Sequence, residues 1–204
     1  MVYDVKKEKT AVLVIDVQKE YFDEECALYT PNAKVAKDNI IDIVNAAKEN
    51  NIKCFFVQHM HKADGSDIGR MGDFDPTPVF EEGTKGIEFI DDLPIDESDV
   101  VIQKNRYNSF IGTSLKNLLD KIGIDTVIII GLMSNYCCLS TAYYAHDMDY
   151  KTIYVLDAVQ GPDLPDLGYG EVSQEHLKNI IATTLLGGIS DVVSTKEIIS
   201  EICK

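Results

Sequence analysis

Basic residues are scarce in this chain. Its 204 residues include 19 Lys and Arg against 34 Asp and Glu, which gives a formal net charge of −15 at pH 7. Binding of nucleic acid needs a basic face that neutralises phosphates, so the composition argues against a nucleic-acid partner. The acidic excess is best explained as a solvated surface, since surface acid mostly serves solubility.

Cysteine pairs with the C-x-x-C spacing of zinc sites are absent, and the number of cysteines is odd. The cysteines are Cys26, Cys54, Cys137, Cys138 and Cys203. A chain of this length can bury roughly 70% of its unfolded surface, so it does not need disulfides to form a core. We therefore expect free thiols and a location in the reducing cytoplasm.

Long apolar runs are missing as well. The first apolar segment, Ala11–Ile15, already ends at Asp16. It has the length of a buried strand and is too short for a signal peptide or a membrane span, so we expect no membrane partner. The chain shows no internal repeat or low-complexity tract, and its 204 residues suit one α/β domain covering residues 1–204.

Short apolar segments alternate with segments of helical periodicity. The expected strands are 11–15, 52–57, 100–103, 126–130, 152–156 and 189–193, and the expected helices are 30–50, 115–122, one containing Cys137, 173–186 and one that a capping box opens at 194–197. Strands that alternate with helices imply right-handed crossovers and a parallel sheet. We expect a Rossmann-like, three-layer α/β/α sandwich around a six-stranded parallel sheet. The long irregular segment 59–98 is expected to form an active-site loop.

One stretch, residues 127–150, combines a strand, a turn and a helix around a cysteine. An apolar run ends at Gly131, Ser134 and Asn135 form a polar turn, and Cys137 follows in the expected first helical turn. The N–H groups at a helix start have no partner within the helix and carry partial positive charge. A thiol placed there is expected to have a lowered pKa, and the same N–H groups can hold an oxyanion.

Two charged residues are expected at the same edge of the sheet as this cysteine. Asp16 ends the first strand, Lys104 follows the third, and Cys137 follows the fourth. With the common strand order 3-2-1-4-5-6, strand three lies about 10 Å from strand one, a gap that a lysine can bridge. A thiolate nucleophile, a carboxylate that moves protons and an ammonium together suit acyl transfer through a thioester, followed by attack of water.

At these residues the sequence resembles the isochorismatase-like cysteine hydrolase superfamily. The resemblance rests on AVLVIDVQ (11–18), VVIQKNRYNSFIGTSL (100–115), DTVIIIGLMSNYCCLSTAYYAHDMDY (125–150) and VLDAV (155–159). It implies an Asp16-Lys104-Cys137 triad and a cis peptide between Leu132 and Met133. It also implies an oxyanion hole formed by the backbone N–H groups of Met133 and Cys137, and a homo-oligomer, either a dimer or a tetramer.

The resemblance also raises the question of a metal. The nicotinamidase branch carries an Asp-x-His metal site after strand two, where this chain has His59-Met60-His61. His61 matches that pattern and His59 does not, so a two-histidine site would need Asp64 or Asp73 to complete it. Pocket-lining histidines are the favoured interpretation, and we expect no metal and no cofactor.

The expected function is hydrolysis of a C–N bond in a small amide or ureido compound, because the branch that acts on a vinyl ether lacks the cysteine. His59, His61, Arg106, Tyr107 and Tyr136 are candidate substrate contacts, and Arg106 could pair with a substrate carboxylate. Three alternatives remain. They are a metal-assisted nicotinamidase, a non-catalytic domain that binds small molecules or senses redox state, and a vinyl-ether hydrolase, which Cys137 disfavours.

Overall fold

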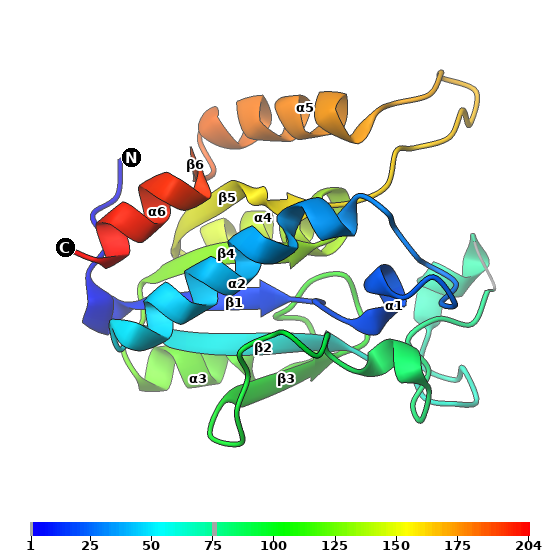
Figure 1. Ribbon diagram of the computed structural model, residues 1–204, viewed down its shortest axis with the longest axis horizontal. Helices are drawn as coiled ribbons and strands as arrows, with labels where there is room; N and C mark the ends of the chain where they lie inside the picture. Colours follow the sequence, from blue (N-terminus) through cyan, green and yellow to red (C-terminus); the bar gives the residue numbers. More distant parts are fainter. Residues whose placement is uncertain (1, 75–76) are drawn as a thin grey trace.

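The computed structural model describes residues 2–74 and 77–204, and their six strands form one sheet. The sheet order is β3-β2-β1-β4-β5-β6, and every neighbouring pair is parallel (Figure 1). The strands are β1 Thr10–Ile15, β2 Lys53–His59, β3 Val100–Lys104, β4 Thr126–Leu132, β5 Lys151–Gln160 and β6 Asp191–Val193. The predicted fold class is confirmed, and the strand order is the common one that was assumed in placing Lys104. The order reverses between β1 and β4, and ligands of such sheets bind beyond the carboxyl ends of the strands at that point.

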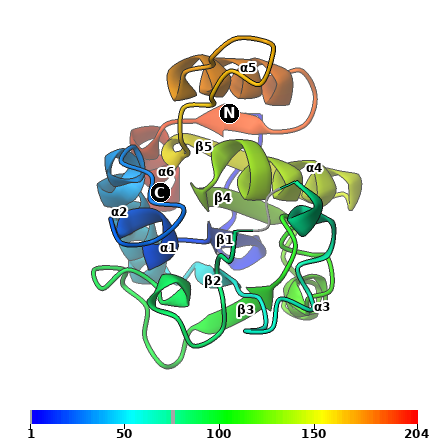
Figure 2. The same cartoon turned by 90° about the vertical axis from the view of Figure 1, so that its right-hand side faces the viewer.

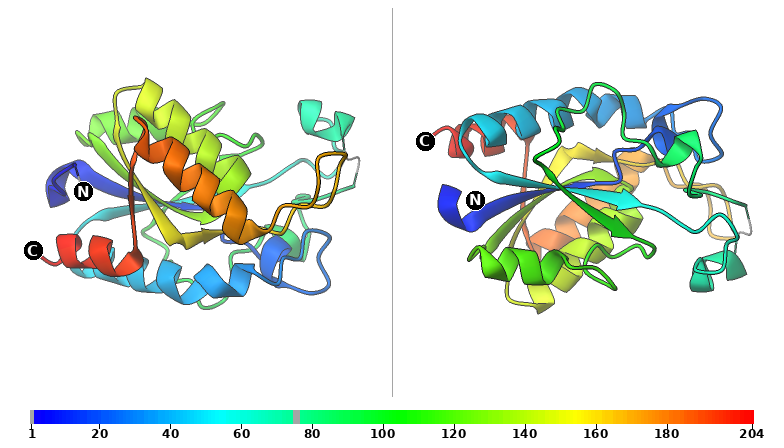
Figure 3. Two further views of the ribbon diagram at one scale, coloured as in Figure 1. Left: turned by 90° about the horizontal axis from the view of Figure 1, so that it is seen from above. Right: turned by 90° about the horizontal axis from the view of Figure 1, so that it is seen from below.

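Helices cover both faces of the sheet (Figure 3). They are α1 Lys19–Phe22, α2 Ala33–Glu49, α3 Leu115–Lys121, α4 Leu139–Asp147, α5 Gln174–Leu186 and α6 Thr195–Ile202. β1 is buried along its whole length. Its side chains alternate, so that Val12 and Val14 pack with α2 and α6, whereas Leu13 and Ile15 pack with α3, α4 and α5. A strand buried on both faces explains the uninterrupted apolar run that marks it in the sequence.

Several element boundaries differ from the sequence prediction by a few residues, and two of these differences have a clear structural reason. The first long helix was expected to begin at Thr30-Pro31, but α2 begins at Ala33. The Thr30 hydroxyl donates to the Leu28 carbonyl, so it does not cap the helix. The fifth strand was expected to stop before Asp157, but β5 continues to Gln160 after a shift in its pairing with β4. The capping box at Ser194 is present as predicted.

The segment between β2 and β3 lies over the carboxyl edge of the sheet, which faces the viewer in Figure 2. It contains two short 3-10 turns, Gly69–Asp73 and Lys85–Ile87. Single bridges tie it to the rest of the chain at Gln18 with Phe89 and to itself at His61 with Glu81. Within the described part of the chain, no helix has the length and apolar character that a membrane crossing requires.

Candidate active site

The three side chains singled out in the sequence meet at the carboxyl edge of the sheet. Asp16 directly follows β1, Lys104 is the last residue of β3, and Cys137 lies in the turn after β4. Asp16, Lys104 and Cys137 are 0%, 3% and 1% exposed. Charged groups are this deeply buried only when they have partners, because an isolated charge in an apolar interior is very costly.

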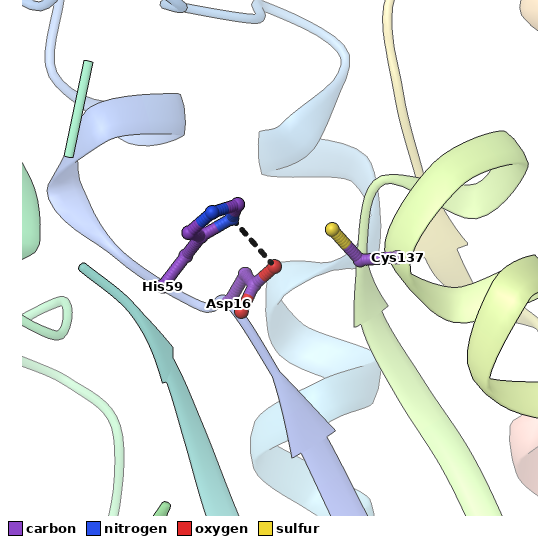
Figure 4. A group of neighbouring side chains, drawn as sticks. All are labelled: Asp16, His59 and Cys137. Carbon is purple, nitrogen blue, oxygen red and sulfur yellow. Dashed lines mark ion pairs between the residues drawn. The ribbon is translucent and has the colours of Figure 1, made fainter. Parts of the chain in front are cut away.

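The Lys104 ammonium is the centre of this group. Its Nζ lies 2.8 Å from Asp16 Oδ2. It also donates hydrogen bonds to His59 Nδ1 at 3.2 Å, to the Arg106 carbonyl at 3.0 Å and to Cys137 Sγ at 3.3 Å. Figure 4 shows how the side chains of Asp16, His59 and Cys137 point toward one another. An ammonium has three N–H donors and no acceptor, so the three hydrogen bonds use all of its protons, and Asp16 is held as an ion pair.

The backbone at Asp16 turns sharply to bring its carboxylate into the site. Its φ is 52°, in the left-handed region, which Asp and Asn tolerate better than most residues because their short polar side chains bond locally. The Asp16 N–H donates to the Val57 carbonyl at 2.9 Å. The end of β1 is thereby fixed to β2, and the carboxylate points toward Lys104 and Cys137.

Burial shifts the titration of all three groups. It raises the pKa of Asp16 despite the opposing charge of Lys104. Burial alone would lower the pKa of Lys104, but the charge of Asp16 and the hydrogen bonds of the ammonium outweigh it and raise the pKa. Burial, together with Asp16, also raises the pKa of the Cys137 thiol. The sequence-based expectation of a lowered thiol pKa was therefore wrong, because a pattern of residues does not reveal desolvation.

The turn that carries Cys137 is a π-helical turn, Ser134–Cys138, and α4 begins after it. The cysteine therefore precedes the α-helix instead of lying in its first turn. The peptide bond between Leu132 and Met133 is cis. The Met133 carbonyl accepts hydrogen bonds from the backbone N–H groups of Tyr136 and Cys138 at 3.2 and 3.1 Å. These contacts fold the turn tightly over the end of β4.

The two histidines of the His59-Met60-His61 motif are buried, at 1% and 2% exposure. Their rings contact each other, with centroids 4.8 Å apart. His59 faces Lys104, as described above, and His61 Nδ1 lies 3.4 Å from Asp67 Oδ1. Asp67 was not singled out in the sequence, because an acid within a long irregular loop gives no signal of where it will lie.

The metal site considered from the sequence does not fit the arrangement. Asp64 is exposed and accepts from the Ser66 N–H, and Asp73 pairs with Arg70. Within residues 2–74 and 77–204, the one cluster of three candidate ligands is Asp16, His59 and Cys137. All three lie within about 3.3 Å of Lys104 Nζ. The ammonium therefore takes the place that a cation would need.

The remaining candidate contacts lie nearer the surface. Arg106 Nη1 donates to the carbonyls of Asp67 and Asn105, and these bonds hold the 59–98 segment against the end of β3. The binding of a substrate carboxylate by Arg106 stays a prediction. Tyr107 and Tyr136 are partly exposed, and their ring centroids lie 5.1 Å apart. Arg106, Tyr107 and the 69–74 turn line a cavity of about 710 Å³ beside the buried group.

The buried histidines predict that acidification destabilises the fold. Burial lowers the pKa of His59 and of His61 below 6.5, so the folded protein binds fewer protons than the unfolded chain. Their contribution to stability is complete above pH 6.5 and is lost as pH falls through and below that value. The raised pKa of Asp16 acts in the opposite sense. With two histidines against one carboxyl, the free energy of unfolding should fall by up to about 1.4 kcal/mol per pH unit below pH 6.5.

Urea unfolding followed by circular dichroism at pH 7.5, 6.5 and 5.5 measures this dependence. A His61→Asn variant removes one of the two titrating groups and should flatten the dependence. An unfolding free energy that stays constant or rises from pH 7.5 to 5.5 would contradict the assignment of neutral buried histidines.

Comparisons with known proteins agree with this fold. The Isochorismatase domain family matches residues 10–180, and the chain therefore belongs to the isochorismatase family of hydrolases. A solved cysteine hydrolase from Pseudomonas syringae pv. phaseolicola 1448A superposes with a TM-score of 0.95 at 31% identity, covering 98% of this chain and 95% of that one.

Two plant relatives from Arabidopsis thaliana differ in their described activity. Nicotinamidase 3 is 30% identical over 157 residues, covering 76% of this chain and 75% of its own length. A probable inactive nicotinamidase is 28% identical over 176 residues, covering 84% and 89%. Similarity to both shows the family but does not select a substrate.

Proposed function

We propose that the protein is a cysteine hydrolase that cleaves the C–N bond of a small amide or ureido compound through a thioester at Cys137. The observation that carries this proposal is the buried contact of Cys137 Sγ with Lys104, whose ammonium also pairs with Asp16. A thiol, a cation and a carboxylate in one buried site supply a nucleophile, a charge stabiliser and a proton carrier. The similarity to nicotinamidase 3 supports an amide substrate.

The raised pKa values set the order of proton transfers. The resting cysteine is a thiol, so its proton passes to the Asp16 carboxylate as the sulfur attacks the carbonyl carbon. A carboxyl whose pKa is raised by burial is a better base and lies closer to the operating pH. Asp16 then gives this proton to the leaving nitrogen, the C–N bond breaks, and the acyl group remains on sulfur as a thioester.

Hydrolysis of the thioester reverses the same transfers. Asp16 takes a proton from an attacking water, the hydroxide adds to the carbonyl carbon, and the thiol leaves with the proton returned to it. In both halves, the backbone N–H groups of Met133 and Cys137 are the proposed donors to the oxyanion. Lys104 remains an ammonium throughout and stabilises the negative charge as it moves between Asp16 and Cys137.

Ammonia release from a panel of small amides and ureido compounds tests this proposal. The panel includes nicotinamide and N-carbamoyl amino acids, and the wild type is run beside Cys137→Ala, each with and without chelator. We expect release that resists chelator and falls at least about 1000-fold in Cys137→Ala, because the nucleophile is lost. Release that only a chelator abolishes would support the metal-assisted alternative. No release by any compound would favour a binding or sensing domain, as the similarity to a probable inactive nicotinamidase allows.

A further inference from the structure

His59 contacts the Lys104 ammonium through a ring nitrogen. Its Nδ1 lies 3.2 Å from Lys104 Nζ, and its ring lies beside Asp16 and Cys137 (Figure 4). An ammonium only donates hydrogen bonds, so Nδ1 must be the acceptor and must be unprotonated. The imidazole is therefore neutral, with its proton on Nε2. The 3.9 Å separation between Nδ1 and the Asp16 carboxylate is then not an ion pair.

The position of this imidazole is fixed from several sides. The Gln18 side chain bonds both backbone groups of His59, donating to its carbonyl at 2.9 Å and accepting from its N–H at 2.7 Å. The Phe80 ring stacks on the imidazole with centroids 4.7 Å apart and planes 6° from parallel. Tyr21 packs edge-on against Phe80 in turn. A ring held in this way can orient the group to which it is bonded.

The surroundings of His59 favour the neutral form. Burial, Lys104, His61 and Arg106 all lower the pKa of His59. Two acids lie nearby, but both already have partners. Asp16 pairs with Lys104, and Asp67 accepts a hydrogen bond from the Asn105 side chain. A second cation 3.2 Å from the ammonium would push it away from Asp16 and Cys137.

We propose that His59 is a positioning residue that accepts a hydrogen bond from Lys104 and thereby holds the ammonium between Asp16 and Cys137. Four groups surround Nζ: three accept its hydrogen bonds, and Asp16 forms an ion pair with it. The Arg106 carbonyl and His59 Nδ1 anchor the ammonium, whereas Asp16 and Cys137 are the groups on which its charge acts. This inference rests on the proposed role of Cys137 as the nucleophile, but its test does not depend on knowing a substrate.

The test measures how fast iodoacetamide alkylates Cys137 at neutral pH, with the modified residue located by peptide mass spectrometry. His59→Phe keeps a flat ring but removes the acceptor, and we expect alkylation to slow about 10- to 100-fold, the range for losing a hydrogen bond to a charged group. His59→Asn offers a side-chain oxygen as acceptor and should restore most of the rate. Cys54 is a buried cysteine of β2, and its continued protection from alkylation shows that the fold is intact.

A double substitution distinguishes an effect of His59 that is transmitted through Lys104 from an effect of His59 on packing. If His59 acts through the ammonium, His59→Phe has no further effect on alkylation in a Lys104→Met background. An equal loss in both backgrounds would overturn the proposal, as would a His59→Asn rate as low as that of His59→Phe or a His59→Phe rate equal to wild type. If Lys104→Met does not fold, the comparison of the Asn and Phe variants still decides. A failure of the amide panel would leave this result standing, because alkylation requires no turnover.

Discussion

Asp16→Asn and Lys104→Met are each expected to lower the free energy of unfolding by about 3–5 kcal/mol, because each leaves a buried group without its ionic partner. Both side chains are fully buried and lie 2.8 Å apart. Asparagine is the suitable replacement for Asp16 because it also tolerates a φ of 52°. The loss then reports the missing charge instead of backbone strain. Both variants should also lose hydrolysis by at least about 1000-fold, since one lacks the proton carrier and the other the cation.

The double variant Asp16→Asn with Lys104→Met distinguishes a pair from two independent residues. Removing both charges leaves no unpaired ion, so its stability should lie well above the sum of the two single losses. Its activity should stay as low as that of either single variant. Urea unfolding gives the stabilities, and ammonia release gives the activities.

A surface pair provides the matched control. Lys116 and Asp120 form an i,i+4 ion pair on α3, with both side chains about half exposed. Lys116→Met should change stability by no more than about 0.5 kcal/mol, because solvent screens such pairs. The prediction fails if Lys104→Met lowers the free energy of unfolding no more than Lys116→Met does. It also fails if the double variant loses the sum of the two single losses.

The fold could be predicted from the sequence because the central strands are visible as short apolar segments. β1 and β4 are buried on both faces, so they appear as uninterrupted apolar runs. Alternation with helices then fixes the parallel sheet and places every strand end on one edge. Asp16, Lys104 and Cys137 could be placed together for the same reason: each follows or closes a strand.

The details of the site depend on contacts that no local pattern encodes. The Cys137 thiol was expected to have a lowered pKa from its neighbours, but full burial raises it. Asp67 gave no signal in the sequence, yet its carbonyl accepts a hydrogen bond from the Arg106 guanidinium, 39 residues later in the chain. The length of β5 depends on a shift in its pairing with β4. Each of these features arises from residues far apart in the chain.

Gly131→Ala is expected to destabilise the protein by more than about 4 kcal/mol, or to prevent folding, because no space exists for a side chain. Gly131 lies in β4 opposite Ile15 of β1, with a φ of +119°. A Cβ at this position would lie 1.9 Å from the Ile15 carbonyl oxygen and 2.8 Å from the Ile15 nitrogen. These are backbone atoms of a central strand, so they cannot rotate away as a flexible side chain would.

The Gly131→Ala substitution is also expected to disturb the active site, because Ile15 immediately precedes Asp16. Displacing the end of β1 would move the Asp16 carboxylate away from Lys104. Any Gly131→Ala protein that folds should therefore hydrolyse amides and react at Cys137 far more slowly than wild type. Alkylation of Cys137 and urea unfolding, measured on the same preparation, report the two effects separately.

Gly123→Ala is the control that isolates the clash from the backbone conformation. Gly123 follows α3 with a φ of +74°, but no heavy atom lies within 4 Å of the position that a Cβ would take. Alanine there pays only for the left-handed backbone, about 1–2 kcal/mol. Gly131, with a φ of +119°, lies further from the left-handed region, so the difference between the two substitutions measures the close approach of β4 to β1 together with this extra backbone strain. A Gly131→Ala loss no larger than that of Gly123→Ala would show that the two strands can separate without harm. The close contact would then have no part in positioning Asp16.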